Sequence, residues 1–168
     1  EEAQRIVRLW RMSYPEITQL WTRLEIKVAS SMQGNYDETW RCLRFKNRSI
    51  ILPNGMAIHY KNLRYVDGQL VYDSKRGTVS LWGGTIVENV AQALARIILT
   101  DAWLSIIDDP TLPGDIVLQV HDELLYQGPQ RDPNNTIHKL NSHMSSPRDW
   151  APGLPLAAEG GFDKRYSK

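Results

Sequence analysis

A chain of 168 residues with 20 basic and 19 acidic side chains carries a formal net charge of +1 at pH 7. The chain is long enough to bury the core of one domain. Its balanced charge is not the strongly basic signature of a complete nucleic-acid-binding surface, and charge alone predicts no partner.

We expect the protein to reside in a reducing compartment and not in a membrane. A single cysteine, Cys42, excludes an internal disulfide framework. The opening EEAQRIVRLW lacks the pattern of a signal peptide, and no run approaches the ~18 apolar residues of a membrane span. We therefore expect a cytoplasmic protein with no membrane partner.

Two amphipathic helices are predicted at the start of the chain. Apolar residues recur at helical spacing from Ala3 to Trp10, and the pattern resumes between Pro15 and Val28. Ser13 and Glu16 have capping-box spacing, and Pro15 falls in a first turn, where its missing N–H is harmless. The two helices should meet at a bend near Ser13.

Strands are predicted from Thr39 to about Leu81, where short aromatic and β-branched runs alternate with turn residues. In YVDGQLVY, Asp67-Gly68 predicts a two-residue type I′ hairpin, because both residues tolerate positive φ angles. SIILPNGMAIHY predicts a second strand pair around a Pro-Asn-Gly turn.

A long helix should follow Gly83-Gly84, opened by Thr85 with Glu88 in capping-box spacing. One face of this helix is apolar. The polar residues that gather on another face are Glu88, Asn89, Gln92 and Arg96. Spacing of four also suits a solvated face on which Gln92 bonds to a neighbour, and this interpretation stays open beside a functional one.

The run IVLQVHDELLY places His121, Asp122 and Glu123 between apolar segments expected to be strands covered on both faces. Burying such charge costs several kcal/mol unless a cation, a metal or a turn open to water compensates it. A functional cluster and a solvated hairpin turn are both open, and Asp122 could serve both. The tail beyond has one weak helical pattern, Ile137 to Met144.

Other catalytic and metal patterns are missing from the sequence. His138 and His143 are five residues apart, which does not suit zinc on a helix, so we expect solvated histidines. No G-x-S-x-G elbow is present, and Gly83-Gly84 lacks the Lys-Ser/Thr of a phosphate-binding loop.

Four stretches in order resemble the C-terminal part of A-family, DNA polymerase I-like DNA polymerases, especially those of phage-type replication genes. These stretches are LPNGMAIHY, LWGGTIVENVAQALAR, LQVHDELLY and GLPLAAEGGFDKRYSK. The most specific element is QVHDEL between apolar strands, preceded by an E-N-x-x-Q-A-x-A-R helix. The resemblance implies an α+β fold, a palm-type antiparallel sheet with packed helices.

The resemblance also implies three parts of the chain. Residues 1–33 would be the helical end of a fingers subdomain, which SYPEITQLW fits, and residues 34–82 a β-rich insertion. Residues 83–168 would be the C-terminal palm with the His-Asp-Glu hairpin.

In that family a primer hydroxyl attacks the α-phosphate of a deoxynucleoside triphosphate with two Mg²⁺ ions at the reacting oxygens. By this resemblance Asp122 would bind metal, Glu123 would support the site and His121 would approach the primer terminus. Mg²⁺ would be the cofactor, and primer-template DNA and deoxynucleoside triphosphates the partners.

The helix before this run would contact DNA in the family. Gln92 matches a glutamine that reaches the minor groove, where an amide donor checks pair shape without reading sequence. Glu88 stands where relatives often carry asparagine, and Asn89 is adjacent. Arg96 would contact phosphate or brace the acidic site.

Two family motifs have no match: the D-Y-S-x-x-E strand with the second metal-binding aspartate, and the R-x-x-x-K-x-x-x-F/Y-G nucleotide-binding helix. We therefore expect a fragment or split subunit of a DNA-directed DNA polymerase, inactive alone, whose partner is an amino-terminal half, in the host cytoplasm if phage-encoded. The alternatives are a non-catalytic relict palm module that binds protein or DNA, and a structural domain.

Overall fold

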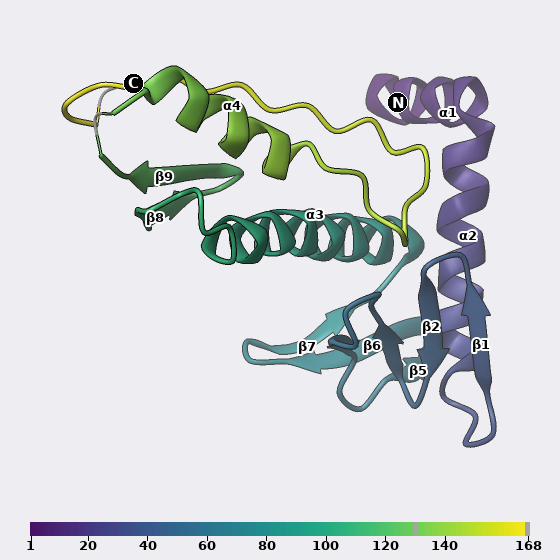
Figure 1. Ribbon diagram of the computed structural model, residues 1–168. Coiled ribbons are helices and arrows are strands. Elements are labelled where there is room, and N and C mark those ends of the chain that lie inside the picture. Colours follow the sequence, from purple (N-terminus) through teal and green to yellow (C-terminus); the bar gives the residue numbers. More distant parts are fainter. Residues whose placement is uncertain (130, 167–168) are drawn as a thin grey trace. The chain divides into compact units, whose positions relative to one another are not determined.

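The computed structural model describes residues 1–129 and 131–166 (Figure 1), so Gln130 and the last two residues of GLPLAAEGGFDKRYSK lie outside the described part. The chain divides into two compact units, Glu1–Ala93 and Leu94–Lys168, and the division falls inside one long helix. Helices combine with antiparallel strands, which confirms the α+β class. A palm-type sheet and the parts 1–33, 34–82 and 83–168 stay predictions.

The first unit opens with the two predicted helices, α1 (Glu2–Ser13) and α2 (Pro15–Ser30). Pro15 lies in the first turn of α2, as predicted. The predicted capping box is wrong: Tyr14 is the N-cap, and the Ser13 hydroxyl donates to the Leu9 carbonyl at 3.0 Å. Ser13 is still inside α1, so a carbonyl one turn back is its nearest acceptor.

Two antiparallel sheets follow in the first unit, one of four strands and one of three. The four-stranded sheet has the order β1 (Asp37–Trp40), β2 (Leu43–Lys46), β3 (Ser49–Ile51) and β4 (Ala57–His59). The three-stranded sheet has the order β5 (Arg64–Val66), β6 (Gln69–Ser74) and β7 (Gly77–Ser80). Helix α2 lies alongside β1 and β2 in this unit (Figure 1).

Both hairpins predicted from turn residues are present. Asp67 and Gly68 join β5 to β6 with φ angles of 49° and 78°, the positive values that a type I′ turn requires. β3 and β4 pair antiparallel around the Pro-Asn-Gly loop.

Asp73 accepts hydrogen bonds from Asn62, Arg64 and Thr78, which lower the pKa of its carboxyl to about 2.

The core of the first unit collects apolar side chains from α2, both sheets and the start of the next helix. Its buried members are Leu24, Val28, Leu43, Phe45, Ile50, Leu52, Tyr60, Leu63, Leu70, Val71, Leu81, Ile86 and Val90. Among the strands of this unit, β2, β3 and β6 contribute buried apolar residues to the core, whereas the apolar residues of β1, β4, β5 and β7 are half-buried or exposed.

Helix α3 (Gly83–Ile107) begins two residues before the predicted Thr85. A Cβ on Gly83 would lie 2.2 Å from the carbonyl oxygen of Trp21, so only glycine allows α3 to start this close to α2. The Gly83 amide donates to the Glu25 carboxylate at 2.8 Å, which supplies the N-terminal partner expected of a cap.

By length and composition α3 is apolar enough to cross a membrane, which corrects the expectation that no such run exists. Few charged residues interrupt its alanines and aliphatic side chains. A helix at the core of a globular protein meets the same criterion. Val90, Ile97, Ala102 and Ile106 are among the buried residues of α3, and 28% of its apolar window is buried.

The second unit contains the end of α3, the hairpin of β8 (Asp115–Val120) and β9 (Glu123–Gln127), and α4 (Pro133–Met144). The predicted helix around Ile137 is therefore confirmed, and Asp132 caps it by accepting from the Asn135 amide at 3.3 Å. The expectation of strands covered on both faces is wrong in the described residues, because β8 pairs only with β9 and leaves Val117 56% exposed.

Removing the Phe45 ring tests the core of the first unit. Phe45 is 0% exposed, so Phe45→Ala should lower the free energy of unfolding by about 3–5 kcal/mol in urea titrations. Phe162, the other phenylalanine of the chain, is 63% exposed, and Phe162→Ala should change the free energy of unfolding by no more than about 0.5 kcal/mol. Equal losses in the two variants would contradict this core.

Candidate functional site

His121 and Asp122 form the two-residue turn of the β8–β9 hairpin. Val120 pairs with Glu123 across the turn, and His121 has a φ angle of 53°. The side-chain amide of Gln119 donates to the His121 carbonyl at 3.0 Å, which braces the turn. Both turn residues are exposed, so the Asp122 carboxylate is not buried away from water. Of the two open interpretations of this run, the hairpin turn is the observed geometry.

Glu123 lies in a different environment from its neighbour. It is the first residue of β9 and is half-buried, whereas Asp122 points from the exposed turn. Two successive carboxylates therefore differ in how far solvent reaches them. Of the two carboxylates, that of Asp122 is the more accessible to solvent.

The hairpin by itself is an incomplete metal site. In residues 1–129 and 131–166, no group of three or more His, Cys, Asp or Glu side chains could hold a metal ion. Mg²⁺ is usually bound through one or two protein carboxylates with waters and substrate phosphates as its other ligands. Asp122 fits one such ligand, and the remaining ligands would come from outside the described residues.

The predicted polar face of α3 begins in the first unit with Glu88, Asn89 and Gln92. Gln92 donates from its side-chain amide to the Glu88 carboxylate at 3.2 Å, and both side chains are exposed. This is the local pairing expected of a solvated helix face. Within residues 1–129 and 131–166, the second N–H and the carbonyl oxygen of the Gln92 amide bond to no protein group and remain available to a ligand.

Asn89 has a structural role within the same unit. Its side-chain amide donates to the Tyr60 hydroxyl at 3.3 Å, and Tyr60 is only 2% exposed. Burial raises the pKa of the Tyr60 hydroxyl. Asn89 therefore uses one of its side-chain N–H groups to satisfy the buried Tyr60 hydroxyl, and that group does not face a ligand.

Arg96 is the one predicted DNA-contacting residue that lies in the second unit, as the His-Asp-Glu residues do. Its side chain is exposed, and in the described part of the chain no carboxylate pairs with its guanidinium. Its carbonyl accepts from the Thr100 hydroxyl at 2.8 Å. The predicted residues thus fall into two groups, one in each compact unit.

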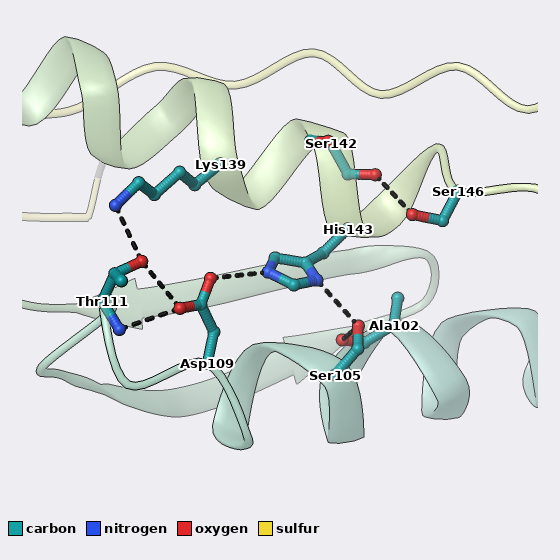
Figure 2. Close-up of polar contacts among 8 residues, drawn as sticks. All are labelled: Ala102, Ser105, Asp109, Thr111, Lys139, Ser142, His143 and Ser146. Atoms are coloured by element: carbon teal, nitrogen blue, oxygen red, sulfur yellow. Dashed lines mark hydrogen bonds and ion pairs between the residues drawn. The ribbon is translucent and has the colours of Figure 1, made fainter.

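A polar network that the sequence did not predict lies in the second unit (Figure 2). His143 approaches Asp109 with Nε2 at 2.9 Å from Oδ2, and its Nδ1 lies 3.0 Å from the Ser105 hydroxyl. Thr111 donates to Asp109 through both its hydroxyl and its amide, at 2.7 and 2.8 Å. Lys139 donates to Thr111 at 2.7 Å. The network ties α4 to the end of α3 and the loop after it.

The network corrects the expectation of a solvated His143, whose side chain is 25% exposed. Thr111 and His143 hold the pKa of the Asp109 carboxyl well below its usual range. The Ser105 hydroxyl lies 2.9 Å from the Ala102 carbonyl, to which it donates, and 3.0 Å from Nδ1 of His143. We call the cluster of Ser105, Asp109, Thr111, Lys139 and His143 the clasp, because it joins α4 to the end of α3 and the loop after it.

One comparison with known proteins finds a relative. The chain is 27% identical over 183 residues to a protein named DNA polymerase from Bacillus phage SP02, and the match covers 99% of this chain. The chain spans 28% of that relative's length. No protein-family model and no solved structure matches the chain. A DNA polymerase relationship at low identity therefore extends along nearly the whole sequence.

The clasp should stabilise the protein in a pH-dependent way. Because the folded pKa of Asp109 is lowered, its contribution is fully present above the unfolded pKa of about 3.9 and is lost as pH falls through the folded value. Asp109→Asn should lower the thermal midpoint at pH 7, and the difference from the unmodified protein should shrink below about pH 4.

The matched control is the adjacent, exposed Asp108. Asp108→Asn should leave the thermal midpoint nearly unchanged from pH 7 to about pH 3. A difference for Asp109→Asn that is the same at every pH, or equal effects of the two substitutions, would contradict the clasp.

Proposed function

We propose, on the premise of its relationship to a phage DNA polymerase, that the chain is the C-terminal palm part of an A-family, phage-type DNA-directed DNA polymerase. It would act in DNA replication as a segment of a longer enzyme or as a split subunit. Two features support this proposal: the four motifs occur in the family's order, and the low-identity match to the phage protein covers 99% of the chain.

The observation that carries the proposal is the position of Asp122. Its carboxylate stands at an exposed two-residue turn between β8 and β9, whose residues pair up to the turn on both sides. A carboxylate there reaches ligands in solvent while the paired strands fix the ends of the turn. Rigid presentation of a first ligand is what a metal-assisted reaction requires of its protein.

In the proposed reaction the 3′ hydroxyl of a primer attacks the α-phosphate of a deoxynucleoside triphosphate, and pyrophosphate leaves. Asp122 would hold the catalytic Mg²⁺, Glu123 would support Asp122 from the start of β9, and His121 would lie toward the primer terminus. Mg²⁺, when bound, supplies charge stabilisation at the attacking and leaving oxygens. The partner half contributes the second aspartate and the cations that hold the triphosphate.

Helix α3 contacts the DNA in this proposal. Gln92 places an amide donor in the minor groove, where acceptors occupy nearly the same position in every base pair. Glu88 orients Gln92 through their 3.2 Å hydrogen bond, and Asn89 holds the helix to Tyr60. Arg96 contacts a phosphate with its exposed guanidinium.

A second candidate function is a non-catalytic palm module that binds a protein or DNA. It is favoured by the lack of a complete metal-binding group in residues 1–129 and 131–166. The two functions differ in one measurable property, because only the polymerase requires the Asp122 carboxylate for nucleotide incorporation.

Substituting Asp122 in an active enzyme tests the proposal. This chain would replace the aligned segment of the Bacillus phage SP02 DNA polymerase, and primer extension with Mg²⁺ would be measured for the chimera and for this chain alone. Asp122→Asn should lower the incorporation rate by more than about 100-fold, because even residues that only support metal ligands are worth about 10–100-fold. The chain alone should not extend the primer.

Asp108→Asn in the same chimera is the control, since it removes an exposed carboxylate of the same unit and should leave extension unchanged. An Asp122→Asn chimera that retains full activity would overturn the metal assignment. A chimera that folds and binds DNA but extends no primer, even with Asp122 intact, would favour the non-catalytic module.

Gln92→Ala tests the minor-groove contact in the same chimera. Loss of one hydrogen bond should reduce the preference for matched over mismatched primer ends by up to about tenfold, with little change in overall DNA affinity. Glu88→Gln, which keeps a hydrogen-bonding group beside Gln92, should have a smaller effect. Unchanged discrimination in the Gln92→Ala chimera would remove Gln92 from the groove.

A further inference from the structure

Two arginines flank one tryptophan on the surface of the first unit. Trp40 ends β1, Arg41 follows it in the β1–β2 turn, and Arg23 comes from α2. The guanidinium carbons of Arg41 and Arg23 lie 5.0 and 5.7 Å from the centre of the Trp40 ring. These three residues form the Arg–Trp–Arg cluster, and all three belong to the same compact unit.

The indole holds both guanidiniums in place. A guanidinium within about 6 Å of an aromatic ring is attracted by the negative face of the ring. Trp40 is half-buried, while Arg23 and Arg41 are both exposed. The tryptophan thus orders two cations whose N–H groups still reach solvent.

The cations around the cluster are already neutralised, whereas those of the cluster are not. Lys27 pairs with Glu38, and Arg44 and Lys46 both pair with Asp37. In the described part of the chain, neither Arg23 nor Arg41 has a carboxylate partner. The cluster is therefore a local site of unbalanced positive charge on a chain whose net charge is only +1.

The turn itself does not explain an arginine at position 41. Arg41 has a φ angle of 54°, a left-handed conformation in which glycine and asparagine are favoured at two-residue hairpin turns. A long cationic side chain is thus presented at a strained backbone position. Arg48, in the β2–β3 turn, has a similar φ angle of 57°, so the feature that distinguishes Arg41 is its position over the Trp40 ring.

We propose, resting on the proposed function for the identity of the ligand, that the Arg–Trp–Arg cluster binds the phosphate backbone of the primer-template duplex. Guanidiniums match phosphate oxygens with paired N–H donors, and ordering by the indole reduces the freedom lost on binding. Contacts with phosphate position DNA without reading its sequence. This site gives the β-rich region 34–82 a function as a DNA grip outside the hairpin of Asp122.

DNA binding by the 168-residue chain tests the cluster. Fluorescence anisotropy would follow a labelled primer-template duplex from about 50 to about 200 mM salt. The slope of log K against log salt is negative, and each lost phosphate contact reduces its magnitude by about 0.9. The double substitution R23Q/R41Q should weaken binding and reduce the magnitude of this slope by about 2. R23K/R41K, which keeps both charges, should recover most of the slope.

The matched control is R5Q/R44Q, which removes two arginines that are paired with Glu2 and Asp37. It changes the net charge equally and should change the slope by less than half as much. Equal effects of the two doubles would overturn the proposal, because net charge would then account for binding. Circular dichroism must show equal thermal midpoints for all variants, and R23K/R41K separates lost charge from lost folding.

Further outcomes separate this proposal from the proposed function. Normal DNA binding by R23Q/R41Q, together with a chimera inactivated by Asp122→Asn, overturns the cluster and leaves the polymerase assignment intact. An active Asp122→Asn chimera, together with weakened DNA binding by R23Q/R41Q, overturns the metal assignment of Asp122 and supports the cluster as a DNA-binding site. Failure of the chain to bind the duplex, with binding of poly-glutamate that R23Q/R41Q abolishes, overturns DNA as the ligand in favour of an acidic protein.

Discussion

The arrangement of the first unit depends on a close approach of two backbones. Gly83 lies against the carbonyl of Trp21, where any Cβ would sit 2.2 Å from the oxygen, and its amide donates to Glu25. Helix α3 therefore starts in direct contact with α2, without side chains between them. This anchored start lets Asn89, further along α3, bond to the buried Tyr60. The direction of the polar face that includes Gln92 follows from the same contact.

The protein handles its charged side chains in two ways. Some carboxylates within the two units, among them Asp37, Asp73 and Asp109, are paired or accept several hydrogen bonds. Two of the charges to which we assign functions stand instead at exposed two-residue hairpin turns, Arg41 between β1 and β2 and Asp122 between β8 and β9. Such a turn holds the backbone firmly while leaving the side chain open to a ligand.

The candidate site was visible in the sequence only in part. The run QVHDEL, with apolar strands on both sides, identified Asp122, but a buried cluster and an exposed turn were equally compatible with its composition. The bond between His143 and Asp109 joins residues 34 positions apart, and no local pattern links them. Arg23 and Trp40 likewise meet only because α2 packs beside β1 and β2.

The sequence by itself determined the local elements: the helices from their periodicity, the break at Pro15, and the hairpin at Asp67-Gly68, because these follow from interactions between near neighbours. It misplaced helix starts, since Ser13 and Thr85 matched a capping pattern that the packed helix ends did not use. Only the tertiary structure decided which charges are neutralised and which remain open to solvent. That outcome depends on contacts between segments far apart in the chain, and composition does not encode their distances.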